Sequence, residues 1–244
     1  MVVLRTNNLV LILFGILQAH VSVGFSPMAR NARVGKNLNG KREQKHVVLH
    51  ATGNLGTPVC DYLTVTIPPT SQGPPRQAVI VEDLTPTLQN LLDESKMKNG
   101  VINVISRHTT TALTINERES RLARDMEDFF LSLAPPDERS FSESATPFVR
   151  YYHNDIDQRP DSPEEAQRCR ENGWQVDDPR QLDAWRQQEP INAHSHLISM
   201  LLGSSESIPV VNGEMVIGQW QSVLLVDLDG PRERTVGVQF LGYQ

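Results

Sequence analysis

Residues 101–117 read VINVISRHTTTALTINE. Val101–Ser106 is an apolar run with β-branched residues, which is typical of an interior strand, and Thr109–Ile115 is a second β-rich segment close behind it. From Glu117 to Leu133, apolar residues recur at helical spacing, and Pro135-Pro136 closes that pattern. This part of the chain therefore predicts two strands followed by a helix.

Toward the N-terminus, the pattern predicts a strand, a short strand and a further helix. Cys60–Ile67 is rich in Tyr, Thr, Val and Ile, and Val79–Val81 has room for a short strand. Thr85 is a suitable N-cap, because Pro86 then takes the first helical position. Asn99-Gly100 is expected to end this helix.

Toward the C-terminus, residues 157–190 are polar and predict a surface excursion with short helices at Glu164–Arg170 and Leu182–Gln187. A helix is expected at His196–Leu202. Strands are expected at Phe148–Tyr152, at Ile208–Val211 and Glu214–Ile217 around an Asn212-Gly213 turn, at Gln219–Leu228 and at Thr235–Leu241. The predicted fold class is α+β, a single domain with helices packed against one mixed or antiparallel β-sheet.

Composition excludes several classes of protein. The chain has 244 residues, is 39% hydrophobic and has two cysteines, so it can bury a core but cannot build a disulfide framework. Residues 1–50 hold seven basic side chains and one acidic one, which leaves 16 basic and 28 acidic side chains in the remainder. A body this acidic repels a phosphate backbone, so no nucleic-acid partner is expected.

The first 24 residues predict a cleavable signal peptide. Arg5 precedes the apolar run Leu9–Leu17, and Ser22-Val23-Gly24 supplies small residues at a cleavage site. The run is shorter than the ~20 residues that cross a bilayer, so no stable membrane span is expected in the mature form. A retained membrane anchor is the alternative.

Residues 25–56 predict a second targeting element that is disordered. Phe25 opens a stretch with five basic side chains before its first acid, Glu43. Together the two segments resemble the two-part plastid presequence of algae with secondary plastids. That resemblance implies a mature protein of residues 57–244 in a plastid, and simple secretion is the alternative.

Four histidines of the mature domain lie in polar, turn-like segments: His108, His153, His194 and His196. Three neutral imidazoles can hold a zinc-type ion with one open position, whereas the alternative is that the rings are scattered and hydrogen-bonded. Positions i and i+2 of a helix point about 200° apart, so only one of His194 and His196 is expected to take part.

Other polar residues each have a functional and a structural interpretation. Asn116 and Glu117 stand where a β-rich segment gives way to a helix, so they are either a base or an orienting group, or a helix cap. Thr109 and Thr110 could bind phosphate or could be plain strand residues. Beyond Gly218, Trp220-Gln221 marks either a ligand contact or a β-bulge with a packed indole.

Five blocks of this sequence, taken in order along the chain, resemble the YjbQ family over about residues 57–244. The first, Ser106–Glu117, is similar to the family's HTSxxLTINE motif. The others are Tyr152–Asn154, His196–Gly203, Ile208–Val210 with Gly213, and Gly218–Gln221. The resemblance implies an α+β homotrimer linked to a secondary thiamine-phosphate synthase activity, which joins a pyrimidine diphosphate to a thiazole phosphate and releases diphosphate.

The resemblance also assigns roles. It implies that the metal ligands are His108, His153 and His196, that Asn116 and Glu117 are catalytic, and that the residues facing a small phosphorylated metabolite are Arg107, Thr109, Thr110, Gln221 and Arg234. Three histidines favour a zinc-type divalent metal over magnesium, which prefers oxygen. The alternatives are a zinc-type hydrolase with Glu117 as base and a non-catalytic trimer that binds a metabolite. Gln219 and Asp227–Arg232 depart from the family pattern, which suggests a distinct subgroup.

Overall fold

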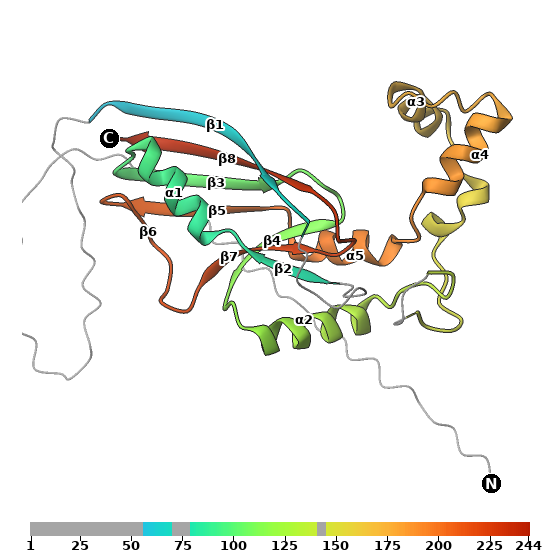
Figure 1. Cartoon of the computed structure of the whole chain (residues 1–244), viewed down its shortest axis with the longest axis horizontal. Coiled ribbons are helices and arrows are strands. Elements are labelled where there is room, and N and C mark those ends of the chain that lie inside the picture. The colour runs from blue at the N-terminus through green and yellow to red at the C-terminus, as the bar shows by residue number, and fades with distance from the viewer. Residues whose placement is uncertain (1–55, 70–78, 141–144) are drawn as a thin grey trace, which may run out of the picture. The chain divides into compact units, whose positions relative to one another are not determined.

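The computed structural model describes residues 56–69, 79–140 and 145–244, all within one compact unit, Thr52–Gln244 (Figure 1). The predicted signal peptide and transit-like segment lie outside the described residues, apart from Gly56. In the described part of the chain, no helix combines the length and the apolar character that a membrane crossing requires. The unit has the predicted α+β class, with helices against antiparallel sheets.

The strands form two sheets instead of the single sheet that was expected. The five-stranded sheet has the order β1 (Pro58–Ile67), β8 (Arg234–Tyr243), β3 (Asn99–Ser106), β5 (Ser205–Val211), β6 (Glu214–Met215). The three-stranded sheet has the order β2 (Ile80–Asp83), β7 (Ser222–Asp227), β4 (Thr111–Asn116). All strand pairs are antiparallel.

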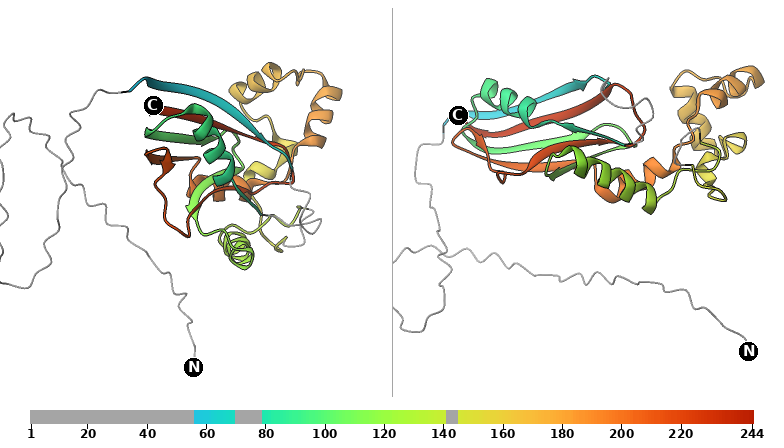
Figure 2. Two further views of the ribbon diagram at one scale, coloured as in Figure 1. Left: turned by 60° about the vertical axis from the view of Figure 1, so that its left-hand side comes forward. Right: turned by 60° about the horizontal axis from the view of Figure 1, so that its bottom comes forward.

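The helices are α1 (Thr85–Ser95), α2 (Ser120–Leu133), α3 (Pro163–Glu171), α4 (Pro179–Gln188) and α5 (Ala193–Leu202), with two short 3₁₀ turns, η1 (Tyr152–Asn154) and η2 (Ile156–Gln158). Helix α1 packs with the five-stranded sheet, whereas α2 and α5 cover the outer face of the three-stranded sheet (Figures 1 and 2).

The side-chain alternation of β7 explains this layering. Leu225 points into a core shared with α1 and the five-stranded sheet, and Val226 points into a second core with Phe130 of α2 and Ile198 of α5. Both residues are at most 1% exposed. Because successive side chains of a strand face opposite ways, a strand that is apolar at every position must be covered on both faces. The run Val223–Val226 meets this condition.

The predicted hairpin between β5 and β6 is confirmed. Asn212 and Gly213 both have positive φ, 55° and 84°, as a two-residue type I′ turn requires. Gly213 N–H also donates to the carbonyl of Lys98, 2.8 Å away, which fixes the turn against the end of α1.

Three local predictions were wrong. The N-cap of α1 is Leu84 and not Thr85, whose hydroxyl instead accepts Val223 N–H at 2.9 Å. Helix α1 ends at Ser95, with Lys96 as its C-cap in the left-handed region (φ 58°), and not at Asn99-Gly100, because those two residues open β3. Phe148–Tyr152 is not a strand: Tyr151 N–H donates to the Asp137 carboxylate instead of a neighbouring strand. Of the two interpretations of Trp220, the structure excludes the packed indole, because Trp220 is 71% exposed and lies in a turn before β7.

The 157–190 excursion forms the two predicted helices, α3 and α4, around its own apolar cluster of Cys169, Val176 and Trp185. Arg159 joins these helices: it pairs with Glu165 and Glu189, and its guanidinium lies 5.4 Å from the centre of the Trp185 ring. Figure 1 shows both helices extending beyond the end of the sheets. The cluster shares no residue with the two main cores.

Candidate metal centre

Two of the predicted histidines meet at one end of the three-stranded sheet. The ring centres of His153, in η1, and His196, in the first turn of α5, are 4.8 Å apart, and their planes cross at 71°. His196 is half-buried and His153 is exposed as a residue, so the pair opens to the surface of the chain.

The surroundings favour the neutral form of both rings. Burial lowers the pKa of His196, and the neighbouring His153 lowers it further, while the Asp229 carboxylate opposes this shift. Partial burial also lowers the pKa of His153, with a smaller contribution from the Arg159 cation. Metals bind imidazole in its neutral form, so a histidine whose pKa is lowered is a suitable candidate ligand.

The buried side-chain amide of Asn192 lies near His153. Asn192, 4% exposed, donates from Nδ2 to Asp229, 2.8 Å away, and this bond fixes which end of its carboxamide is oxygen. The Oδ1 atom is buried, has no hydrogen-bond partner by normal geometry among the described residues, and lies near His153, whose pKa it raises. It is therefore available to hold a ring N–H of His153.

His194 lies on the other side of α5, as the i, i+2 argument predicts. Its side chain faces inward and the residue is 8% exposed. Its Nε2 is 3.3 Å from the Ser195 hydroxyl. Burial lowers the pKa of His194, so the ring is a neutral part of the protein interior.

His108, the third predicted ligand, faces a different group of residues. It lies between β3 and β4, and its Nε2 accepts the N–H of Thr235 at 2.8 Å and stands 3.1 Å from the Thr235 hydroxyl. A neutral ring that accepts at Nε2 carries its proton on Nδ1, so neither nitrogen has a free lone pair in this conformation. Among the described residues, no three His, Cys, Asp or Glu side chains are grouped closely enough to hold a metal.

The two predicted phosphate-binding arginines differ sharply. The Arg234 guanidinium binds Asp227 through Nε at 2.9 Å and through a second nitrogen, and both side chains are 6% exposed. Arg107, by contrast, is exposed and forms no ion pair with any carboxylate of the described chain. Of these two arginines, Arg107 is the one that is open to a ligand.

The remaining predicted residues are distributed around these segments. Asn116 and Glu117 are exposed, and Asn116 Oδ1 accepts Glu117 N–H at 2.8 Å. The N-cap of α2 is Glu119, whose carboxylate accepts two N–H groups of the first turn, so α2 begins at Ser120 and not at Glu117.

Thr109 adjoins His196, whereas Thr110 is 6% exposed and its carbonyl accepts Leu228 N–H at 3.1 Å. The Gln221 side chain accepts Gly218 N–H at 2.6 Å, which closes the turn before β7.

Two buried polar residues beside the His153 turn, Asn154 and Asp137, were not predicted from the sequence. Asn154 and Asp137 are 1% and 0% exposed, and Asp137 accepts hydrogen bonds from Arg139, Tyr151 and Asn154. A signal for Asn154 exists, because an amide follows a histidine in a turn-like segment. Asp137 gives no such signal, since its partners lie up to 17 positions away.

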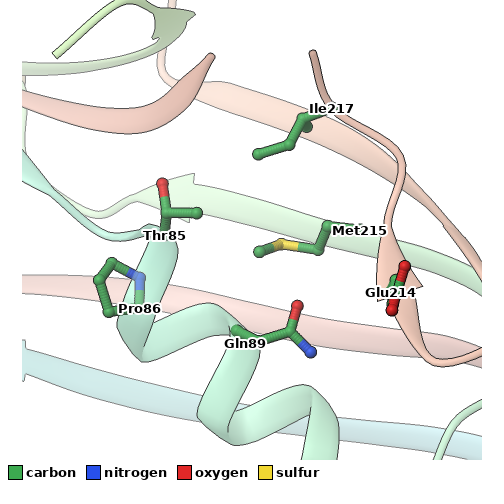
Figure 3. A pocket seen from close by; sticks show the side chains of 6 residues that line it. All are labelled: Thr85, Pro86, Gln89, Glu214, Met215 and Ile217. Atoms are coloured by element: carbon green, nitrogen blue, oxygen red, sulfur yellow. The ribbon is translucent and has the colours of Figure 1, made fainter. Parts of the chain in front are cut away.

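A separate open pocket of about 430 Å³ lies between the start of α1 and β6 (Figure 3). Its lining residues are Thr85, Pro86, Gln89, Glu214, Met215 and Ile217, and Figure 3 shows Met215 extending toward α1. It contains one ionisable side chain, Glu214, and none of the predicted site residues. This pocket therefore offers no acid–base or metal-binding group of residues.

The family model described as "UPF0047 protein YjbQ-like" matches residues 73–243. A UPF0047 protein of Methanothermobacter thermautotrophicus is 34% identical over 160 residues, which cover 66% of this chain and 81% of that protein. The UPF0047 protein YugU of Bacillus subtilis is 24% identical over 161 residues, covering 66% and 88%.

A solved structure of a YbjQ-like protein of unknown function from Sulfolobus solfataricus has a TM-score of 0.52 and 25% identity, and the match covers 75% of this chain and 97% of that one. The matched region contains both sheets apart from β1, all five helices and both histidines of the pair. On the family model and the 34% identical relative, the chain belongs to the UPF0047 YjbQ-like family.

Proposed function

We propose that this protein is a metal-dependent enzyme that acts on a small phosphorylated metabolite, with His153 and His196 as two of its metal ligands. The observation that carries the proposal is the His153–His196 pair: two rings with lowered pKa, 4.8 Å apart, open to the surface, with the buried Oδ1 of Asn192 near His153. A surface-open pair leaves room for further ligands and for substrate.

The third ligand would be His108 of a neighbouring copy in a homotrimer. Because its Nε2 accepts the N–H of Thr235 in this conformation, ligation would require that bond to be exchanged for the metal. The His153–His196 pair faces outward, so it is open to a neighbouring subunit. Exposed apolar side chains on the same helix as His196 favour such an interface: Leu197, Met200 and Leu201 are 39%, 73% and 64% exposed.

The donor set fits a zinc-type ion better than magnesium, because imidazole nitrogen suits zinc and magnesium demands oxygen. When bound, such an ion would stabilise the negative charge that develops on a leaving phosphate. The exposed guanidinium of Arg107 would neutralise the same charge from the protein side. Arg234 would not contribute directly, because Asp227 already occupies its guanidinium.

The reaction we propose is that of a secondary thiamine-phosphate synthase, in which the thiazole nitrogen attacks the pyrimidine methylene carbon as diphosphate leaves. Thr109, Gln221 and Arg107 would orient the substrates, and Asn116 and Glu117 would handle protons at the edge of the site. The second candidate is a zinc-type hydrolase with Glu117 as base, which is favoured by the exposure of that carboxylate.

A metal assay and a turnover assay test these proposals on purified protein loaded with zinc. If the metal proposal holds, the protein binds nearly one zinc ion per chain, and His153→Ala loses it. The control is Tyr152→Ala, at the adjacent residue, which is 95% exposed, and this variant should keep the zinc. The synthase proposal expects thiamine phosphate to form from both precursors. Zinc binding without this product would reject the synthase, and hydrolysis that Glu117→Gln abolishes would select the hydrolase.

A metabolite-binding trimer without catalysis is the remaining alternative, and it predicts ligand binding with no turnover under any metal. We also propose that residues 1–24 and 25–56 address the protein to a plastid. Fluorescent fusions test this in an alga with secondary plastids: a fusion to 1–56 should enter the plastid, and a fusion to 1–24 should be secreted. Secretion of both would favour the simple secretory route.

A further inference from the structure

One carboxamide links the two segments that carry the histidine pair. Asn154, the residue directly after His153, accepts the backbone N–H of Ala193 through Oδ1 at 3.1 Å. Ala193 is the first residue of α5, the helix that carries His196. The two linked residues are 39 positions apart in the sequence, so this bond is a tertiary one.

The start of α5 depends on this remote acceptor. The first N–H groups of a helix have no partner within the helix, and the N-cap side chain normally supplies one. Here the N-cap is Asn192, which makes no capping hydrogen bond because its carboxamide is directed to Asp229. Asn154 therefore supplies the acceptor for the Ala193 N–H that the N-cap residue does not provide.

Asp137 fixes the orientation of the Asn154 carboxamide. Its carboxylate can only accept, so the Asn154 group that faces it at 3.3 Å must be the Nδ2 donor, and the oxygen must face Ala193. Arg139 compensates the charge of Asp137 with a hydrogen bond from Nε at 2.8 Å and a second from its terminal nitrogen. With both carboxamide ends held, Asn154 has one defined orientation at 1% exposure.

This arrangement sets the separation of the two rings. His153 is one residue before Asn154, and His196 is three residues after Ala193, on the same face of the first helical turn. The Asn154 bond therefore joins the turn that carries His153 directly to the helix that carries His196.

We propose that Asn154 is the positioning residue of the histidine pair: it joins the turn of His153 to the helix of His196, and Asp137 holds it in the required orientation. The inference rests on the proposed function for its purpose, since ligation is the reason to hold two rings at a fixed spacing. Its geometry is independent of any metal. Asn154 itself contacts neither metal nor substrate in this proposal.

The first test needs no substitution. In the wild-type protein without metal, the Ala193 amide should be protected from hydrogen exchange measured by NMR, although amides at the start of a helix usually exchange rapidly. Rapid exchange of the Ala193 amide would overturn the proposal, whatever happens in the variants.

The second test follows the His153 and His196 side-chain protons by NMR, because each ring shifts the resonances of the other at this separation. Asn154→Ala should abolish the mutual shift while Tm falls only modestly, and Asp157→Ala serves as the control, since Asp157 is exposed in the neighbouring turn η2 and bonds Gln158. Unchanged ring shifts in folded Asn154→Ala would overturn the proposal. If Asn154→Ala does not fold, the exchange test still decides.

The third measurement separates this inference from the proposed function. Asn154→Ala is expected to weaken zinc binding about 10–100-fold, the usual loss when a group that orients a ligand is removed. If wild-type protein binds no zinc, the proposed function fails, whereas the exchange and ring-shift results still test the positioning role. If zinc binds but Asn154→Ala binds it equally well, positioning fails and the metal centre stands.

Discussion

Arg234 and Asp227 form a nearly fully buried ion pair at the junction of β7 and β8: two guanidinium nitrogens bind the two carboxylate oxygens, and each side chain is 6% exposed. The same guanidinium donates to the carbonyl of Asp229 at 2.9 Å. Asp229 in turn holds Asn192. The Arg234–Asp227 ion pair is thus linked through Asp229 to Asn192, which lies near His153.

Loss of one partner of this pair should be strongly destabilising. Asp227→Ala leaves the Arg234 charge buried without compensation, which costs about 3–5 kcal/mol in the free energy of unfolding. Urea unfolding measures this loss. The matched control is Asp177→Ala. Asp177 also binds an arginine, Arg170, through two nitrogens at 3.0 Å, but its side chain is 75% exposed, so its loss should destabilise the protein far less. Equal losses would show that burial of the pair adds nothing.

Acid stability should depend on Asp137. Hydrogen bonds from Arg139 hold the pKa of Asp137 well below its ordinary 3.8. A carboxyl whose pKa is lowered by folding stabilises the protein above its unfolded pKa, and this contribution disappears as the pH falls through the folded pKa. The free energy of unfolding is measured between pH 5 and 2 in steps of about half a pH unit. As the pH falls, it should decrease more steeply for the wild type than for Asp137→Asn. If the free energies of the two proteins fall in parallel, the loss of stability in acid arises from other carboxyl groups, such as Asp155.

Mixed trimers should restore metal binding if the site is shared between subunits. His108→Ala and His153→Ala should each bind no zinc alone. In trimers reassembled from equal amounts of both, roughly a quarter of the interfaces would join an intact His153–His196 pair to an intact His108 from the neighbour. Zinc content near that fraction supports the shared site. No zinc in the mixture would place all ligands in one chain or exclude His108 from the site.

The α3–α4 excursion should unfold separately from the rest of the domain. Trp185 is 5% exposed and central to an apolar cluster that shares no residue with the other cores. Trp185→Ala should cost about 3–5 kcal/mol locally. Limited proteolysis should then cut within 157–190 while the sheets stay intact. A single cooperative loss of all structure would show that the excursion is coupled to the sheets.

The sequence predicted most of the elements because their local signals agree. Alternating or continuous apolar runs identified β1, β3, β7 and β8, and Asn212-Gly213 identified the hairpin through its positive φ values. The errors lie where a distant group overrides local preference. Asn99-Gly100 is a normal helix terminator, yet pairing with Gly242 and Tyr243 makes it the start of β3.

The site was predictable in its residue types and only partly in its geometry. Local polarity marked all four histidines of the domain, and the i, i+2 rule predicted that only one of His194 and His196 would take part. The family resemblance selected His196, which the structure pairs with His153, while His194 is buried. No local feature distinguishes Arg107 from Arg234, although one is open to solvent and the other is bound to Asp227. That difference arises from which side chains the folded sheets bring opposite each other.

By itself, the sequence determined the class of the fold and most of its elements, and it supplied a set of candidate site residues, since periodicity and turn preferences act over a few positions. Only the tertiary structure decided that there are two sheets, that His153 and His196 meet while His108 faces Thr235, and that Asn154 bonds both Asp137 and Ala193. These relations depend on hydrogen bonds and contacts between residues far apart in the chain, and spacing along a sequence does not encode which of them form.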